Sequence, residues 1–275
     1  MHKTRKELAK LLPSIDLVIE IIDSRLPLAS SNPLIQELIS NQKHLKILSK
    51  KDLADPKITK LWLKQFDNAI TLNINQDKKL ANTLIEKAKH MLPKRGTILK
   101  PIRAIILGIP NVGKSSLINT LAGKKIAKVG NEPAVTRQIQ PITLSREFFI
   151  RDTPGIMSPS PKDEASGFKL AISGAIRDTA MDYLSSAYFF IDYLIYYYPN
   201  CLQTRYQIDS HLQSSDLILD NIAKHIGAIR ENKQANLHRA AERLILDYRN
   251  GRLGKISLEH PDNKDNELFC SQFNI

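Results

Sequence analysis

An eight-residue segment at positions 108–115, Gly-Ile-Pro-Asn-Val-Gly-Lys-Ser, has the residue types and spacing of a phosphate-binding loop. Its two glycines allow the backbone to turn N–H groups toward phosphates, Lys114 supplies a full positive charge, and Ser115 is placed to bind Mg²⁺. An apolar stretch at 102–107 predicts a buried strand before the loop, and residues 116–121 predict a helix after it. This context favours a nucleotide site over a glycine-rich turn that binds nothing.

A second short motif, Asp152-Thr-Pro-Gly155, follows a strand-like segment at 147–151. It matches the Asp-x-x-Gly of nucleotide switches, in which the aspartate holds Mg²⁺ through a water and the glycine N–H faces the γ-phosphate. The interval from Ser115 to Asp152 leaves room for one helix, a mobile loop and one strand. Within it, Thr136 is the candidate to bring a hydroxyl to Mg²⁺ and the γ-phosphate, although an ordinary loop threonine is the alternative. Thr136 and Gly155 are thus the switch candidates, and the catalytic group stays unknown.

The guanine-reading motif of such proteins, Asn-Lys-x-Asp, does not occur after Asp152, but a near match occurs earlier in the chain. This is Ser49-Lys-Lys-Asp52, which closes the strand-like segment 44–48, and open α/β sheets bind ligands at the carboxyl ends of their strands. The Asp52 carboxylate can accept two hydrogen bonds from guanine that adenine cannot offer, and Lys50 would lay its alkyl stem over the base. Taken alone, the string is equally compatible with an ordinary surface segment. The three motifs occur along the chain in the order base motif, phosphate loop and switch. This order favours a guanine-binding role for Ser49-Lys-Lys-Asp52 over an ordinary surface segment.

This order resembles the ribosome biogenesis GTPase A (RbgA/YlqF) family of circularly permuted GTPases. The similarity extends over nearly the whole chain and rests on segments 15–25 (Ile-Asp-Leu-Val-Ile-Glu-Ile-Ile-Asp-Ser-Arg), 27, 32–33, 49–52, 108–116, 133–137, 152–155, 175–178 and 247–254. It implies an α/β fold, in which a P-loop GTPase domain has a doubly wound, mostly parallel, circularly permuted sheet and is followed by a small all-helical domain. It also implies a cytoplasmic GTPase that acts in assembly of the large ribosomal subunit and binds rRNA through its C-terminal domain.

Carried onto this chain, the motifs and the resemblance predict a GTP/GDP site formed by Ser49, Lys50, Lys51, Asp52, Asn73, Asn111, Val112, Gly113, Lys114, Ser115, Ser116, Thr136 and Gly155. The Mg²⁺ ligands would be Ser115, Thr136 and Asp152, the last through a water. Asn111 matches a family asparagine that resembles those that help to hold K⁺.

Three departures from the family pattern qualify these assignments. Ser49 stands where the family usually has asparagine, and a serine is too short both to contact the base and to tie the motif to the phosphate loop. Asn73 replaces part of a Ser-Ala pair whose backbone contacts the base, so that change should be tolerated. The family also commonly has a Phe-Pro-Gly-His segment ahead of Met1, so we expect the histidine that could position water to be absent.

Composition agrees with a soluble protein that has a polyanionic partner. Forty Lys and Arg against 28 Asp and Glu in 275 residues give a net charge of +12, which favours RNA, although a merely basic surface is the alternative. Cys201 and Cys270 are the only cysteines, and no signal peptide is apparent; both features are typical of the cytoplasm. The aromatic run 187–199 is too short and too polar to span a membrane. Its rings could stack on bases, but a place in the core is favoured. We expect a monomer without membrane association.

Hydrophobic patterning predicts two domains and a tail. Strands at 17–22, 44–48 and 69–72 alternate with helices at 3–12, 33–39, 56–66 and 78–91, which indicates a parallel sheet covered by helices. After position 155 the pattern is helical, over 166–175, 179–198, 212–227 and 233–250. We therefore assign residues 1–157 to the GTPase domain, 166–258 to a helical RNA-binding domain and 259–275 to a flexible tail.

The segment 230–255 carries the candidate RNA-binding residues. It holds seven basic residues against three acidic ones, and Arg239 and Arg243 share a helix face at i, i+4 spacing. With Lys255 they are the RNA-binding candidates, and a solvated face is the alternative.

Two classes of function remain open. The leading one is a GTP-hydrolysing assembly factor, slow alone and activated by the ribosomal particle; the alternative is a GTP-gated RNA-binding or docking protein with little hydrolysis. A P-loop ATPase or kinase is disfavoured because Asp52 selects guanine.

Overall fold

The computed structural model describes residues 2–39, 42–72, 80–123, 140–153, 161, 163–209, 214–230 and 234–262. The chain divides into two compact units. Unit 1 comprises Met1–Asp52 and Lys60–Ser160, and unit 2 comprises Leu53–Thr59 and Pro161–Ile275.

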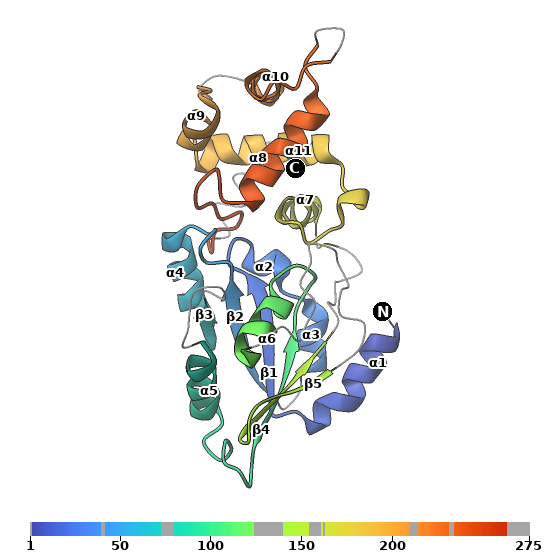
Figure 1. The fold of residues 1–275 in the computed structure, drawn as a ribbon, viewed down its shortest axis with the longest axis vertical. Helices are drawn as coiled ribbons and strands as arrows, with labels where there is room; N and C mark the ends of the chain where they lie inside the picture. Colours follow the sequence, from blue (N-terminus) through green and yellow to red (C-terminus); the bar gives the residue numbers. More distant parts are fainter. Residues whose placement is uncertain are drawn as a thin grey trace. The chain divides into compact units, whose positions relative to one another are not determined.

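Unit 1 is built on a six-stranded sheet with strand order β3-β2-β1-β4-β6-β5 (Figure 1). The strands are β1 (Leu17–Asp23), β2 (Lys43–Ser49), β3 (Ala69–Thr71), β4 (Ile102–Leu107), β5 (Gln140–Ser145) and β6 (Phe148–Asp152). Neighbouring strands are parallel except for the pair β5 and β6. The predicted mostly parallel α/β sheet is therefore confirmed.

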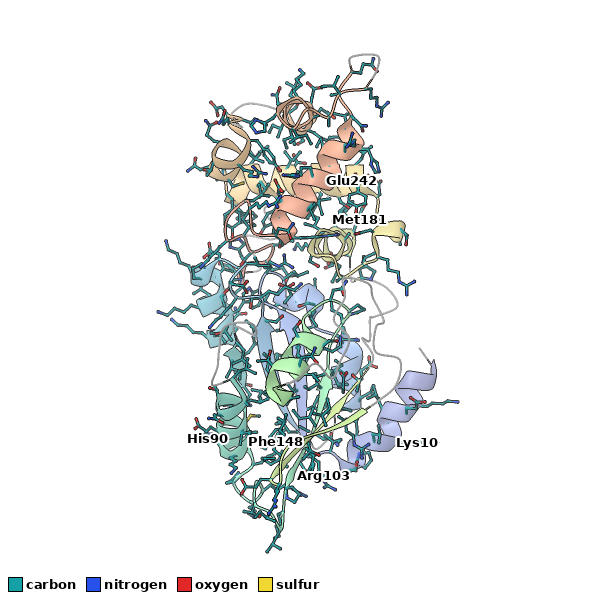
Figure 2. The ribbon with its side chains drawn as sticks, viewed as in Figure 1. Lys10, His90, Arg103, Phe148, Met181 and Glu242 are labelled. Carbon is teal, nitrogen blue, oxygen red and sulfur yellow. The ribbon has the colours of Figure 1, made fainter. Side chains whose placement is uncertain are left out.

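The strand order determines where a ligand site can form. From β1 the chain adds β2 and β3 on one side and then returns to β4 on the other side of β1. Beyond β4 it forms the edge strand β5 before β6 comes back between β5 and β4. The carboxyl ends of β1 and β4 therefore flank the point at which the strand order reverses, which is where open α/β sheets bind ligands. Arg103 and Phe148, labelled in Figure 2, lie near the starts of β4 and β6 and thus mark the opposite edge of the sheet.

Helices bury both faces of the sheet, as the complete burial of all seven residues of β1 requires. On one face, Leu8 and Ile35 pack with Val18 and Ile105. Ile19, which points to the other face, is equally buried. The helices of this part of the chain are α1 (His2–Leu11), η1 (Leu12–Ser14), α2 (Pro27–Ser30), α3 (Pro33–Leu38), α4 (Pro56–Gln65), α5 (Leu80–Met91) and α6 (Lys114–Ala122).

One strand of the sheet differs from the sequence-based expectation. The interval between Ser115 and Asp152 was expected to hold a single strand, but it holds both β5 and β6, paired antiparallel with a bulge between Thr143 and Ser145. β5 is the last strand in the sheet, and Pro141, which has no N–H to donate, is tolerated at such an edge. The proline and the small number of apolar residues hide this strand from pattern analysis.

Unit 2 is a helical bundle. Its helices are α7 (Glu164–Ser173), η2 (Asp178–Ala180), α8 (Tyr183–Tyr197), α9 (Asn200–Tyr206), α10 (Ser215–His225) and α11 (Leu237–Arg249). α8 and α11 pack against each other, and α10 packs on both. Phe189, Phe190 and Tyr193 are buried, so the prediction that the aromatic run belongs to the core is confirmed for these rings. The short helix α9 was not predicted.

The Leu53–Thr59 segment folds with these helices although it lies far away in sequence. The N–H of Ile256 donates to Leu53 O (3.1 Å), and the Ser257 hydroxyl accepts from the N–H of Asp55 (3.1 Å). The Tyr193 hydroxyl donates to Ser257 O (3.0 Å) and so fixes the same stretch to α8.

The chain stays packed just beyond this point. Glu259 is buried, and the ring of His260 stacks on Tyr197 with centroids 4.3 Å apart. Residues 263–275 of the predicted tail lie outside the described residues.

Candidate functional site

The phosphate loop leaves the buried strand β4 and enters α6 through a tightly bent backbone. A Cβ atom at Gly108 would lie 2.6 Å from Ile21 O, so only glycine fits where the loop passes β1. Asn111 (φ 60°) and Gly113 (φ 98°) adopt left-handed conformations, which asparagine tolerates better than most residues. These turns give the segment the concave backbone that anion sites require.

Lys114 is the first residue of α6, and its ammonium group is folded back into the loop. Its Nζ donates to Gly108 O (3.0 Å) and Ile109 O (2.6 Å), and the side chain is almost completely buried. Burial lowers the pKa of Lys114 to about 8, and the negative charge of Asp152 offsets part of that effect. An anion in the loop would stabilise the charged form further, so the lysine is suited to meet phosphate oxygens.

Ser49 connects the base motif to the phosphate loop. It is the last residue of β2 and is fully buried, and its Oγ lies 2.6 Å from Val112 O and 2.9 Å from Ile22 O. A serine was expected to be too short for both tasks, and for the tie to the phosphate loop that expectation is wrong. Because its hydroxyl is occupied there and shielded from solvent, contact with a base is the task that it gives up.

Lys50 and Asp23 form an ion pair that sequence analysis did not foresee. Lys50 has a left-handed backbone (φ 53°), and its Nζ lies 3.0 Å from Asp23 Oδ2. Arg25 NH2 is 2.8 Å from the same oxygen. Burial would raise the pKa of Asp23, but the charges of Arg25 and Lys50 hold it well below its ordinary value. The sequence feature that could have pointed to Asp23 is its position at the carboxyl end of a buried strand.

The remaining predicted residues fall into two groups. Asp52 is exposed, and within the described part of the chain nothing hydrogen bonds to its carboxylate, which leaves it available to a base. Asp152 is buried at the end of β6, beside β4. Lys51, Ser115 and Ser116 are partly buried. Asn73, Thr136 and Gly155 lie outside the described residues.

The three candidate RNA-binding residues have different surroundings. Arg239 lies in the first turn of α11 and is exposed, as is Lys255 after the helix. Arg243 is half-buried, with its Nε 3.1 Å from Asp247 Oδ1. Arg243 is thus part of an internal ion-pair arrangement, while Arg239 and Lys255 have the exposure of a solvated surface.

Comparison with known proteins finds relatives of this chain among GTPases. A family model described as 50S ribosome-binding GTPase matches residues 103–219. Ribosome biogenesis GTPase A of Bacillus cereus is 36% identical over 272 residues, which cover 95% of this chain and 92% of that protein. Mitochondrial ribosome-associated GTPase 1 of Mus musculus is 30% identical, over 94% of this chain and 88% of that protein.

Solved structures share the fold. A structure titled as GNP-bound YlqF from T. maritima superposes with a TM-score of 0.66 at 24% identity, and the match covers 94% of this chain and 99% of that one. A GDP-bound YlqF structure gives a TM-score of 0.69, also at 24% identity, over 93% and 99% of the two chains. The family model begins at β4, so the base motif at the end of β2 precedes the part of the chain that it matches. With relatives of more than 30% identity over almost its whole length, the chain belongs to the ribosome biogenesis GTPase A family.

Proposed function

We propose that this chain binds GTP at the carboxyl edge of the unit 1 sheet, hydrolyses it to GDP and phosphate, and assists assembly of the large ribosomal subunit by binding precursor particles and rRNA while GTP is bound. The observation that carries the proposal is the 2.6 Å contact between Ser49 Oγ and Val112 O. This contact joins the base motif to the phosphate loop, and the two motifs together distinguish a guanine nucleotide site from a general phosphate site. The description of the matching family model supports the large subunit as partner.

Mg²⁺ and K⁺ complete the proposed site. Ser115 in the first turn of α6 and Asp152 at the end of β6 offer hard oxygen donors from neighbouring elements, which suits Mg²⁺. Thr136 is the proposed third protein contact, and Asp152 acts through a water. When bound, Mg²⁺ neutralises charge that develops on the phosphates. Asn111 is the proposed contact for K⁺, so K⁺ should stimulate turnover where Na⁺ does not.

The γ-phosphate is sensed, in this proposal, by Thr136 and by the N–H of Gly155. Ile156 follows where small signalling GTPases have a water-orienting glutamine, and an alkyl side chain cannot orient water. The isolated chain should therefore turn over GTP slowly, and the ribosomal particle should accelerate the reaction. We place this activity in the cytoplasm and assign it to a monomer.

No helix among the described residues has the length and apolar character needed to cross a membrane.

The decisive experiment is sedimentation with large-subunit precursor particles in the presence of GTP, GDP or a non-hydrolysable GTP analogue, with phosphate release measured in parallel. Binding should occur with GTP and the analogue but not with GDP, and particles should raise turnover. Lys114→Ala should abolish both effects because it removes the loop's full charge. Nucleotide-dependent binding without accelerated turnover would favour the alternative of a GTP-gated binding protein. Equal binding in all three nucleotide states would refute the GTP-dependent function.

A further inference from the structure

Three arginines in unit 2 converge on a single buried carboxylate, that of Asp247 in α11. Arg205 at the end of α9 places its Nε 2.7 Å from Asp247 Oδ2, and Arg252 places NH1 3.2 Å from Oδ1. Arg243, one turn before Asp247, has its Nε 3.1 Å from Oδ1. The hydroxyl of Tyr206 donates to Oδ2 at 3.1 Å. We call Arg205, Arg243 and Arg252 the Asp247 arginine cluster.

The end of α11 places Arg252 in this cluster. Gly251 adopts a left-handed conformation (φ 71°), the N–H of Gly251 donates to Tyr248 O (3.0 Å), and the N–H of Arg252 donates to Asp247 O (2.8 Å). This pair of hydrogen bonds is the Schellman arrangement, which reverses the chain at a helix end. The residue after the glycine is therefore brought back beside the carboxylate of the preceding turn.

The cluster carries more positive charge than its carboxylate can neutralise. Burial would raise the pKa of Asp247, but hydrogen bonds from Arg205 and Tyr206 and the charge of Arg243 hold it below its ordinary value. One carboxylate thus faces three guanidinium groups, which leaves an excess of two positive charges. Within the described residues, Asp247 is the only acidic group that contacts any of the three.

The arginines remain accessible although their partner is not. The Asp247 side chain has no exposed surface, whereas those of Arg205, Arg243 and Arg252 are 28%, 39% and 51% exposed. Each guanidinium has five N–H donors. Arg205 and Arg252 each donate a hydrogen bond to Asp247, whereas Arg243 is held at ion-pair distance and its Nε makes no hydrogen bond. Glu242, labelled on α11 in Figure 2, is about 100° around the helix from Arg243 and faces His238 instead. Among the residues that the structure describes, no acid other than Asp247 pairs with these guanidiniums, so their outer edges present donors to the surface.

A purely structural role explains only part of this arrangement. A buried ion pair between α9 and α11 would join the two helices, but a single arginine would neutralise Asp247, and each further cation near the first adds repulsion. Planar guanidinium groups fixed on one side and open on the other suit phosphate oxygens, to which arginine forms paired hydrogen bonds.

We propose that the Asp247 arginine cluster binds backbone phosphates of rRNA in the large-subunit precursor, with Asp247 as the positioning residue that orients the three guanidiniums. This inference rests on the proposed ribosomal function and specifies its RNA contact. It differs from the sequence-based assignment, because Arg205 and Arg252 join Arg243 while Arg239 and Lys255 are not part of the cluster.

Charge-removing variants of the full chain test the cluster. Arg205→Gln and Arg252→Gln, bound to precursor particles with the GTP analogue across a salt series, should each lower the slope of log affinity against log salt by about 0.7–0.9. At 0.1 M salt this corresponds to roughly sixfold weaker binding per lost contact. Lys224→Gln is the matched control: it removes one exposed positive charge from α10, where Lys224 pairs with Asp220, and it should leave the slope unchanged. Equal effects of all three substitutions would mean that net charge alone matters and would overturn the proposal.

Asp247→Asn separates orientation from charge. If only net charge mattered, loss of this negative charge would tighten binding to particles; if Asp247 orients the arginines, binding should weaken and the salt slope should fall. Should thermal unfolding show that Asp247→Asn does not fold, Arg252→Lys replaces it: this variant keeps the charge but loses the planar fork, and it should bind more weakly than wild type. Wild-type affinity of Arg252→Lys would contradict the proposed role of guanidinium geometry.

Two further outcomes distinguish a failure of the cluster proposal from a failure of the proposed ribosomal function. If wild-type protein does not bind particles at all, the proposed function fails, whatever the cluster does. If wild type binds and both glutamine variants bind with wild-type affinity and slope, only the cluster proposal fails. Variants that bind protein-free large-subunit rRNA normally but bind particles weakly would indicate an acidic protein as the partner and would overturn the RNA assignment.

Discussion

Ser49→Ala removes the hydroxyl that connects the base motif to the phosphate loop and leaves β2 otherwise unchanged. The Oγ atom lies 2.6 Å from Val112 O and 2.9 Å from Ile22 O, but its single hydrogen can be donated to only one carbonyl at a time. The shorter distance favours Val112. A net hydrogen bond contributes about 1 kcal/mol, and a buried acceptor that loses its donor raises the cost to about 1–3 kcal/mol.

That energy should appear in both stability and nucleotide affinity. If about 1 kcal/mol of it is needed to hold the loop in its binding conformation, affinity falls roughly fivefold. Ser49 contacts the loop itself, at Val112, and the α- and β-phosphates are common to GTP and GDP, so both nucleotides should weaken by the same factor. The thermal midpoint should fall by a few degrees, by the usual relation between free energy and midpoint.

Titration with fluorescent GTP and GDP analogues, together with thermal unfolding, measures these effects. Ser173→Ala is the matched control, because Ser173 is also a buried serine whose hydroxyl donates to a backbone carbonyl, that of Leu170 at 2.9 Å, but it lies in unit 2. The control should lose stability without losing affinity. Affinities of Ser49→Ala within twofold of wild type for both nucleotides would refute the idea that this hydroxyl links the two motifs.

Three other perturbations follow from the site and from unit 2. Lys114, with its pKa lowered to about 8, is partly neutral above pH 8 in the free protein and should take up a proton when phosphates bind. Calorimetry in two buffers should therefore detect a clearly larger proton uptake by the protein at pH 8.5 than at pH 6.5. Absence of uptake would show that Lys114 does not meet the phosphates. Asp52→Asn should shift nucleotide preference from GTP toward xanthosine triphosphate in competition titrations, and an unchanged preference would mean that Asp52 is an ordinary surface residue. Gly251→Ala should cost about 1–2 kcal/mol in backbone strain plus the displacement of Leu53, whose Cδ2 would lie 2.8 Å from the new Cβ. Gly227→Ala, at a similar φ but with open space around it, should show the strain alone, so equal losses in chemical denaturation would argue against the Leu53 contact.

The sequence allowed prediction of those parts of the protein whose chemistry is local. The phosphate loop is recognisable because bending a backbone around phosphates requires glycine at fixed spacing and a lysine at the helix start. β1 and β4 are recognisable because strands buried on both faces are nearly continuous apolar runs, interrupted here by Glu20 and Asp23 in β1 and by Arg103 in β4. β5 escaped because Pro141 and its polar residues leave little apolar alternation, and α9 escaped because its few apolar residues give no clear helical periodicity.

Tertiary pairing is what sequence patterns could not reveal. Asp23 ends β1 and Lys50 follows the end of β2, and Asp247 meets an arginine 42 positions earlier. A carboxylate in a strand or helix looks the same in sequence whether it meets solvent or three guanidiniums. Arg243 was therefore identified as a candidate from its helix face alone, while Arg205, on an unpredicted helix, was not.

The Leu53–Thr59 segment has a consequence for the modularity of this protein. Unit 2 is assembled from two separate stretches of chain, Leu53–Thr59 and Pro161–Ile275, so it is not a terminal appendage that can be cut off or exchanged as one piece. A fragment that starts at Pro161 lacks the backbone partner of Ile256 and the side chain that packs beside Gly251. Chimeras between relatives should therefore take both stretches from the same parent. If only the stretch from Pro161 onward is exchanged, it must pack against the Leu53–Thr59 segment of a different protein.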